Sequence, residues 1–366
     1  MKIAALWNKL LLFLGLGAIS LPFLVWILNS KARFLGAWSL PLGIIYFWLC
    51  FLAVFVSAMW WLKTSKKIIF AVFMVNVVLF FGDFRIRVPQ KQGHPILTWN
   101  TAGLSNNKVN PRQRCVREYL EQWAQKNPEG LVFLQESRKF QRKDFEKALG
   151  MSCKWSPYIA SCAQGWTCNG LMICAGSKWK MQRSQFRDYE ASSSYGFLQM
   201  EVTHKKTKQT FNAMNVHLES LYRTGSLFSD FKRMNNAKDM LRYVFSGFRF
   251  GLMWSWMSQN SENQRKQLDR IHDVLRQLKD PTILVGDFNS PSIQWNHRTF
   301  RNKFTDAHRE TGLFFGATAL RFGVLFSRID YMYLSHQLMW SGPTRVQYDV
   351  QCSDHFPIQS WFDIRK

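Results

Sequence analysis

Two long runs without a charged side chain, Leu10–Ser30 and Phe34–Leu62, constrain the N-terminal part of this chain most strongly. A helix needs roughly 20 apolar residues to span the hydrocarbon core of a bilayer, so each run is long enough. A third apolar run, Ile68–Gly82, has 15 residues and would span if the two lysines before it extend to the surface. We therefore expect a membrane anchor of about three transmembrane helices within residues 1–84.

The orientation of this anchor depends on the number of spans. A cleaved signal peptide is the alternative for the first run, but no small-residue cleavage site follows it and the second run would remain unexplained. With three spans, basic residues are in slight excess on the side of the N-terminus, at Lys2, Lys9, Lys63, Lys66 and Lys67, against Lys31, Arg33, Arg85 and Arg87. This excess puts the N-terminus in the cytoplasm, whereas two spans would put the rest of the chain there. We expect a multi-pass protein of the cell membrane with an extracytoplasmic domain.

The part after the anchor is strongly basic. The chain has 48 Lys and Arg against 24 Asp and Glu, and residues 1–84 hold seven of the former and one of the latter. Residues 85–366 therefore carry a net charge of +18, which attracts polyanions or anionic lipid headgroups. The alternative is a solvated basic surface held close to a negatively charged bilayer.

The chain has seven cysteines, and their spacing fits no zinc-site pattern. Four of them, Cys153, Cys162, Cys168 and Cys174, lie in one window, where an exported domain would form one or two disulfides. Buried free thiols are the alternative, above all for Cys174 at the end of an apolar run. No pairing is predicted for Cys115 and Cys352, which lie apart.

After a short linker at 85–95, strand-like and helix-like stretches alternate over 96–366, which favours an α/β domain. Helices are expected at 112–126 and 264–278, where apolar residues recur at helical spacing. Strands are expected at 96–99, 130–134, 170–175, 197–202, 211–216, 282–285, 329–334 and 356–361.

The stretch 243–257 does not fit an ordinary domain, because it is almost entirely apolar or aromatic and Arg249 is its one charged residue. It is too short to span a bilayer. Trp, Phe and Arg together favour the headgroup region, so this insertion either dips into the membrane surface or folds back onto the protein.

Polar residues follow several of the predicted strands. The strand Thr282–Val285 stops at Gly286, after which Asp287 and Asn289 can hold a water and a phosphoryl oxygen side by side. Similar residues stand at the ends of other strands, in the order Asn100, Glu136, His217, Asp330, Asp354 and His355. Hydrolysis of a phosphoester needs a divalent cation, a positioned water and a proton donor, and Mg²⁺ prefers oxygen ligands.

Each of these residues alone has a structural explanation. Glu136 could cap a helix, His217 could be a core histidine, and Asp330 could pair with Arg328. Several in this order are hard to obtain by accident, so we expect one shared site.

The motifs Gln135-Glu136, Asn215-x-His217-Leu, Gly286-Asp-Phe-Asn289, Arg328-Ile-Asp330 and Ser353-Asp-His355, preceded by Asn100, resemble the endonuclease/exonuclease/phosphatase superfamily. The resemblance runs from about Ile96 to Trp361. It implies a four-layer α/β sandwich, with two mixed β-sheets face to face, helices outside and a site at one edge.

The resemblance also implies roles for the residues that bind metal and water. Glu136 resembles the main carboxylate ligand of a Mg²⁺ ion, which Mn²⁺ could replace, with Asn100 and Asp354 near the metal. Asp287 resembles the group that activates or orients the attacking water. No organic cofactor is implied.

The remaining roles concern phosphate. Asn289 resembles a phosphate-orienting amide and His355 a phosphate-contacting histidine, whose tautomer and basicity Asp330 would set. His217 would donate to a phosphate oxygen or the leaving group. Further phosphate contacts could come from Asn169 and Arg138, for which a turn and a surface ion pair are the alternatives.

Two departures bear on the substrate. The abasic-site repair nucleases of this superfamily have an acid where this chain has Ala102, and they lack a histidine at the position of His217. The chain is thus more similar to the branch with sphingomyelinases, inositol-polyphosphate phosphatases and secreted deoxyribonucleases. We expect a membrane-anchored phosphodiesterase or phosphomonoesterase that acts on a lipid headgroup, with membrane lipids as partners. An extracytoplasmic nuclease, or an inactive module that binds an anionic partner, is the alternative.

Overall fold

The computed structural model of the chain describes residues 93–102, 110–138, 142–158, 169–189, 195–220, 247–290, 295–312, 316–321 and 324–365. The three expected spans lie outside these ranges. Within the described ranges, no helix combines the length and the apolar character that crossing a membrane requires.

The first sheet is mixed and has seven strands. They are β1 (His94–Asn100), β2 (Leu131–Arg138), β3 (Ser152–Pro157), β4 (Asn169–Ala175), β13 (Leu338–Trp340), β14 (Arg345–Val346) and β15 (Ile358–Ile364). Their order is β13-β15-β1-β2-β4-β3, with β14 also paired to β15. β1 and β2 run parallel and the other pairs are antiparallel, so the C-terminal ends of β1 and β2 meet at one edge.

The second sheet is also mixed and has six strands. They are β5 (Trp179–Asp188), β6 (Gly196–His204), β7 (Thr210–His217), β8 (Thr282–Asp287), β9 (Phe304–Asp306) and β12 (Asp330–Ser335), in the order β5-β6-β7-β8-β12-β9. Here β7 and β8 form the parallel pair. Two short strands, β10 (Ala319–Arg321) and β11 (Val324–Ser327), pair separately.

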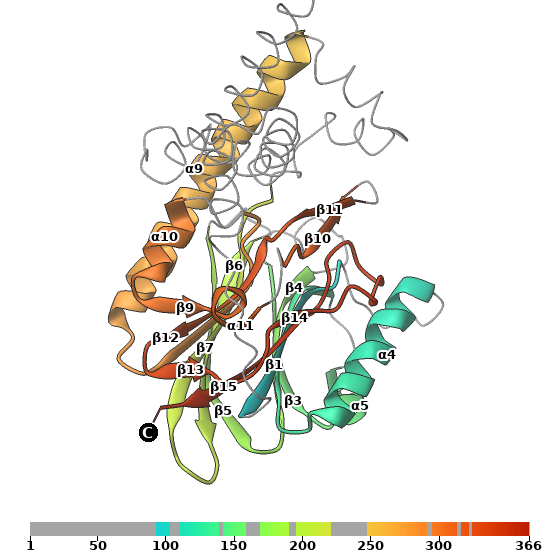
Figure 1. The fold of residues 1–366 in the computed structure, drawn as a ribbon, viewed down its shortest axis with the longest axis vertical. Coiled ribbons are helices and arrows are strands. Elements are labelled where there is room, and N and C mark those ends of the chain that lie inside the picture. Colours follow the sequence, from blue (N-terminus) through green and yellow to red (C-terminus); the bar gives the residue numbers. More distant parts are fainter. Residues whose placement is uncertain are drawn as a thin grey trace, which may run out of the picture.

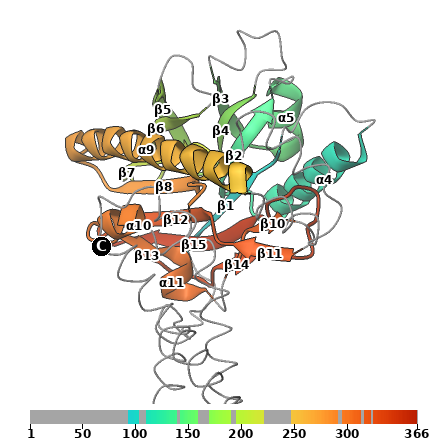
Figure 2. The ribbon, with the colours of Figure 1, turned by 90° about the horizontal axis from the view of Figure 1, so that it is seen from above.

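The helices lie outside the sheets, and Figures 1 and 2 show α4 and α5 on one side and α9 and α10 on the other. Their bounds are α4 Pro111–Lys126, α5 Arg142–Leu149, α9 Gly247–Gln277, α10 Trp295–Arg301 and α11 Ala307–Thr311. α4 begins where expected because the side chain of Asn110 caps it, accepting from the backbone N–H of Arg112, and proline occupies its first turn.

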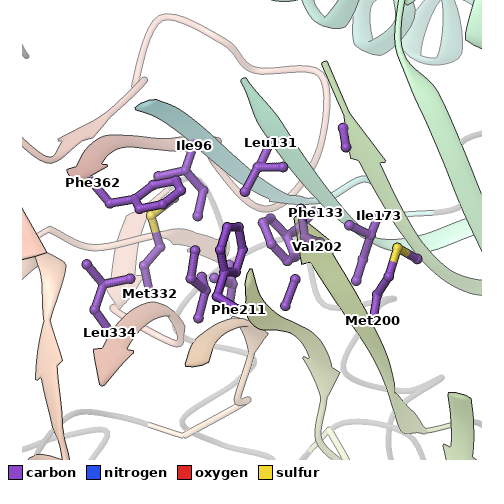
Figure 3. Close-up of a cluster of buried hydrophobic side chains, with 14 of the residues drawn as sticks. Ile96, Leu131, Phe133, Ile173, Met200, Val202, Phe211, Met332, Leu334 and Phe362 are labelled. Atoms are coloured by element: carbon purple, nitrogen blue, oxygen red, sulfur yellow. The ribbon is translucent and has the colours of Figure 1, made fainter. Parts of the chain in front are cut away.

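A core of alternate side chains from both sheets joins them face to face (Figure 3). Phe133 of β2 and Phe211 of β7 belong to it and are fully buried. Fully burying one such side chain contributes about 1.5–3 kcal/mol. The period-2 alternation of strands therefore gives each sheet one face in this central core.

The opposite faces of the sheets pack on the helices. Val116 and Leu120 of α4 share a core with Leu97 and Val132 of the first sheet. Leu268 and Ile271 of α9 and Phe300 of α10 belong, with residues of the second sheet, to another core. Helices, sheet, sheet and helices thus follow one another as layers, and the predicted α/β sandwich with two mixed sheets is confirmed.

Helix α9 is longer than the sequence predicts. Apolar periodicity predicts a helix from 264, but it begins at Gly247 and extends well beyond the sheets (Figure 1). The early residues are almost uniformly apolar, so a helical period is not visible in them. Residues 247–257 of the predicted insertion therefore form the first turns of α9, while 243–246 lie outside the described ranges.

The described part of the chain contains two disulfides. Cys153 and Cys174 are direct partners in the β3–β4 pairing, with Cα atoms 4.0 Å apart, so the free-thiol alternative for Cys174 is wrong. Cys115 of α4 bonds to Cys352, with Cα atoms 5.7 Å apart. This second bridge was not predicted, because the two residues are 237 positions apart and only the tertiary fold brings them together. Cys162 and Cys168 lie outside the described ranges.

Candidate active site

Asp287 lies at the centre of the site, at the end of β8. Its side chain is fully buried, and its two oxygens accept from the backbone N–H of Asn289 at 2.8 Å and from Nδ2 of Asn100 at 2.9 Å. The preceding residue must be glycine, because a Cβ on Gly286 would lie 1.9 Å from the carbonyl oxygen of Val216 on β7 and its φ is +145°. The Gly-Asp sequence thus lets β8 pair closely with β7 and delivers the carboxylate to the edge of the sheet.

Glu136 and Asn100 reach the same place from the first sheet. Asn100 ends β1 and Glu136 stands two residues before the end of the parallel strand β2, and Nδ2 of Asn100 lies 3.3 Å from Oε1 of Glu136. The β2–β4 register shifts between Leu134 and Ser137, and Glu136 has a φ of +52°. A bulge of this kind redirects a side chain, so it accounts for the carboxylate leaving the plane of the sheet toward Asp287.

His217 ends β7, directly opposite Asp287 in the parallel register of β7 and β8. Its Nε2 lies 3.6 Å from Oδ2 of Asp287 and 3.8 Å from Oε1 of Glu136. Its Nδ1 lies 2.8 Å from the hydroxyl of Tyr158. The ring therefore presents one nitrogen to the carboxylates and the other to a buried phenol.

His355 and Asp330 form a second pair. Nδ1 of His355 lies 2.9 Å from Oδ2 of Asp330, and its Nε2 lies 3.8 Å from Oδ2 of Asp287. Burial alone would lower the pKa of His355, but the carboxylates of Asp330 and Asp287 outweigh it and raise the pKa to about 10. The alternative pairing of Asp330 with Arg328 is wrong, because Arg328 instead binds Asp306 at 2.8 Å.

The charge on Asp287 is correspondingly disfavoured. Burial, with the nearby carboxylate of Asp330, raises its pKa to about 7, while His355 and the hydrogen bonds from Asn100 and Asn289 act in the opposite direction. A carboxyl group that exchanges its proton near neutral pH is suited to general base catalysis.

The loop that follows Asp287 is held from beneath by buried polar groups. Asn289 has a φ of +47° and donates from Nδ2 to the carbonyl of Leu218. Nε2 of His297 lies 2.8 Å from Oγ of Ser290, and its Nδ1 lies 2.7 Å from the hydroxyl of Tyr333. Sequence reasoning did not identify His297, whose position on α10 gives no strand-end pattern.

Two motif residues, Gln135 and Asn215, cross-link the two sheets, a role that the sequence did not predict. Nε2 of Gln135 donates to Oδ1 of Asn215 at 2.6 Å. Asn215 donates in turn to the carbonyls of Leu134 and Met172, both at 2.9 Å. Gln135 stands one residue before Glu136 and Asn215 two residues before His217, and this proximity to site residues was the sequence signal that could have identified them. Their hydrogen bond fixes β2 and β7 relative to each other.

The 353–355 motif is held against the end of β1 by several hydrogen bonds. The carboxylate of Asp354 faces Arg112 at 3.5 Å on the surface, and its side chain is 37% exposed. Oγ of the preceding Ser353 donates to the carbonyl of Asn100 at 2.8 Å. Indole Nε1 of Trp99 donates to the carbonyl of His355 at 2.9 Å. These bonds place the 353–355 loop against the end of β1.

Asn169 and Arg138 are opposite each other in the β2–β4 register, beside the bulge. The backbone carbonyl of Asn169 accepts from the N–H of Tyr158 at 2.9 Å. The side chain of Arg138 lies outside the described part of the chain. The phosphate contacts suggested for these two residues stay predictions.

Unusual backbone conformations gather at this site. Among the described residues other than glycine, φ is positive at Ala102, Glu136, Asn289 and Lys208. The first three adjoin or belong to the group around Asp287. Each such conformation costs of order 1–3 kcal/mol and persists where the surroundings enforce it, as at functional sites.

The donor chemistry fits a hard divalent cation beside Glu136 and Asn100. The side chain of Glu136 is 34% exposed. Its carboxylate lies beside the amide of Asn100, which also bonds to the buried Asp287. Asp287, Asp330 and His355 also offer ligand atoms within 4.8 Å of one another. Nδ1 of His355 is already engaged by Asp330 at 2.9 Å, whereas the carboxylate of Glu136 is partly exposed.

Comparisons with known proteins agree with this geometry. A family model described as "Endonuclease/Exonuclease/phosphatase family" matches residues 97–355. No curated protein matches the chain in sequence. The fold is similar to that of an endonuclease/exonuclease/phosphatase protein from Bacteroides vulgatus, with a TM-score of 0.52 and 13% identity, covering 75% of this chain and 100% of that one.

Two further structures are similar in fold. The human Nocturnin catalytic domain with bound sulfate has a TM-score of 0.51 and 15% identity, covering 76% of this chain and 96% of that one. A mannosyl-6-phosphatase from Bacteroides thetaiotaomicron has a TM-score of 0.50 and 13% identity, covering 74% of this chain and 100% of that one. The family match extends over the whole group of site residues from Asn100 to His355. The chain belongs to the endonuclease/exonuclease/phosphatase family, whose members are hydrolases that act on phosphoester bonds.

Proposed function

We propose that this protein is a divalent-metal-dependent phosphoesterase in which Asp287 directs the attacking water. The observation that supports this most strongly is the position of Asp287, buried and within 4 Å of groups on Asn100, His217 and His355. Together with Asp287, these groups come from four separate segments of the chain, and both sheets contribute to them.

In this mechanism Asp287 orients a water and accepts its proton, since its raised pKa matches a base that operates near neutral pH. His355, held by Asp330, and His217 present N–H groups toward the space around Asp287. Preorganised donors of this kind stabilise the negative charge that develops on a phosphoryl oxygen or leaving group. Asn289 holds the Asp287 carboxylate through its backbone N–H.

Glu136 and Asn100 would hold the metal, with magnesium as the first choice. When bound, the cation would offset phosphate charge as a Lewis acid. One or two carboxylates suffice for Mg²⁺, which keeps several of its waters. Asp354 remains a candidate for an outer contact, because it adjoins His355 in sequence.

For the substrate we propose a phosphoester of a lipid headgroup. The expected membrane anchor, the net charge of +18 on residues 85–366 and the aromatic first turns of α9 support this choice. Nucleic acid is the second candidate, since the same positive charge attracts a polyanion.

We also propose that the domain lies outside the cytoplasm, anchored by its N-terminal segments. Two disulfides within the described domain support an oxidising compartment, because such bonds are rare in cytosolic proteins. A C-terminal alkaline phosphatase fusion, which is active only after export, tests this location. An inactive alkaline phosphatase fusion beside a fluorescent C-terminal GFP fusion would contradict it.

The function is tested with the full-length chain in detergent against bis-p-nitrophenyl phosphate, p-nitrophenyl phosphate, sphingomyelin, inositol phosphates and DNA, with Mg²⁺ or with EDTA. We expect Mg²⁺-dependent release of phosphate or of the alcohol from a lipid substrate. Cleavage of DNA alone would reverse the order of substrates. An Asp287→Asn variant as active as the parent on every substrate would instead favour an inactive module that binds an anionic partner.

A further inference from the structure

His217 has a buried partner that is not a carboxylate. Oη of Tyr158 lies 2.8 Å from Nδ1 of His217, and both residues are buried. The other histidine of the site, His355, has the carboxylate of Asp330 in the equivalent place, at 2.9 Å. The two histidines are therefore held by partners of different chemistry.

The position of Tyr158 is fixed by the sheet. It follows β3, and its backbone N–H donates to the carbonyl of Asn169 at the start of β4. A tilted ring contact to Phe186, with centroids 6.3 Å apart, limits its side chain further. The phenol thus reaches His217 from a rigid part of the protein.

The chemistry around the phenol sets the direction of the hydrogen bond. A phenol keeps its hydrogen at neutral pH, so the hydroxyl of Tyr158 has a hydrogen to donate. The phenol also has a hydrogen bond with the backbone of Glu136, whose N–H can donate to the oxygen. The hydroxyl hydrogen is then available to Nδ1 of His217, which accepts it in the tautomer that carries its own hydrogen on Nε2.

The direction of this hydrogen bond determines which ring nitrogen of His217 carries a hydrogen toward the site. An imidazole that accepts at Nδ1 carries its hydrogen on Nε2 when it is neutral. Nε2 is the nitrogen that lies 3.6 Å from Asp287 and 3.8 Å from Glu136. Tyr195 contacts the same ring edge to face, with centroids 5.0 Å apart, and so limits its rotation.

We propose that Tyr158 is a positioning residue that fixes the orientation and tautomer of His217, so that Nε2–H points at the phosphoester. The proposal rests on the proposed function and adds to it a residue that acts only through His217. Because the same phenol also contacts the backbone of Glu136, it ties the positions of a proton donor and a proposed metal ligand to each other.

The test uses the full-length chain and bis-p-nitrophenyl phosphate, or the substrate that the panel above identifies. Tyr158→Phe removes the hydroxyl and keeps the ring, and we expect kcat to fall about 10- to 100-fold with little change in KM. Tyr189→Phe is the matched control, because the Tyr189 hydroxyl is buried without a hydrogen-bond partner among the described residues. It should leave kcat unchanged.

A double-mutant cycle separates positioning from an independent effect. If Tyr158 acts through His217, adding Tyr158→Phe to His217→Ala causes no further loss of kcat. A full additional 10-fold loss in the double variant would overturn the proposal. So would full activity of the single Tyr158→Phe variant.

A spectroscopic readout keeps this test separate from that of the proposed function. In ¹⁵N-histidine spectra, His217 of the parent should show an unprotonated Nδ1 and a protonated Nε2, and Tyr158→Phe should shift both resonances. This result is informative even if no substrate is hydrolysed. A protonated Nδ1 in the neutral ring of the parent would contradict the proposal. This measurement needs only the parent protein, so it decides the question even if the Tyr158→Phe variant fails to fold.

Discussion

Asn100 and Asp287 are 187 positions apart in the chain, yet Nδ2 of the first donates to Oδ2 of the second over 2.9 Å. The bond joins the ends of β1 and β8, which belong to different sheets. The site is therefore assembled across the space between the two sheets, and its geometry depends on both.

Replacing Asp287 by asparagine should separate activity from stability. We expect the rate of hydrolysis to fall by about 10²- to 10⁴-fold, because the amide cannot accept a proton from water. The melting temperature should change little, since the lost hydrogen bond is offset by the removal of a disfavoured buried charge. Asp363→Asn, at an exposed position in β15, is the control for both measurements.

The Cys115–Cys352 disulfide should influence activity as well as stability. Cys352 precedes Ser353, whose hydroxyl binds the carbonyl of Asn100, so the bridge holds the 353–355 loop against β1. We expect Cys115→Ser to lower the free energy of unfolding by about 2–5 kcal/mol and to lower kcat while the protein is still folded.

The other disulfide provides the comparison. Cys153→Ser removes a bridge between adjacent strands, β3 and β4, that is not attached to this loop. It should destabilise the protein with a smaller effect on kcat. Equal losses of kcat in the two variants, assayed well below both melting temperatures, would show that the loop does not depend on its own bridge.

His297 predicts how stability depends on pH. Burial, with Arg301 and Arg328 nearby, lowers its pKa to about 3, although Asp306 and the carbonyl of Ser290 act in the opposite direction. Between pH 6.5 and about 3 the unfolded chain binds a proton that the folded protein does not. Stability therefore falls as pH decreases through this window, by at most about 1.4 kcal/mol per pH unit from this group.

Denaturant unfolding of the parent and of His297→Gln across pH 4–8 measures this contribution. The variant should be less stable at pH 8 but show a weaker decline toward low pH. His336→Gln, at an exposed position, is the control and should keep the slope of the parent. Parallel curves for the parent and His297→Gln would contradict the assignment.

Gly286 should not tolerate a side chain. Gly286→Ala places a methyl group 1.9 Å from the carbonyl of Val216, so β7 and β8 must separate and carry His217 and Asp287 with them. We expect a loss of several kcal/mol in stability and loss of activity. Gly150→Ala also has a positive φ, +62°, but meets no atom within 4 Å and should cost only about 1 kcal/mol.

The sequence predicts the central strands well because their residues are nearly all apolar. β8, for example, reads directly from Thr282–Val285, and it positions Asp287 as the motif suggests. β5 was missed because its sequence from Trp179 to Asp188 is mostly polar, and one edge of the second sheet is formed by it. Short strands such as β13 and β14 take their conformation from pairing with β15, which no local pattern reveals.

The site was predicted in the same uneven way. Residues that end apolar strands, such as Glu136 and His217, are visible in the sequence because their neighbours define the strand. Their supporting residues are not, since Tyr158 and His297 lie outside any such pattern and act through contacts between distant segments. The carboxylate of Asp354 faces Arg112 on the surface, and its expected place near the metal stays a prediction.

The buried link between Gln135 and Asn215 has a consequence for how substrates can be selected. Sliding one sheet over the other would break hydrogen bonds between fully buried side chains and backbone groups, so the two sheets are held rigidly relative to each other beside the site. Site residues on rigidly joined strands present the same reactive groups to every phosphoester that binds there. Selectivity among substrates should then come from residues outside this buried link, so replacing them should change which phosphoester is hydrolysed and leave the chemical step unchanged.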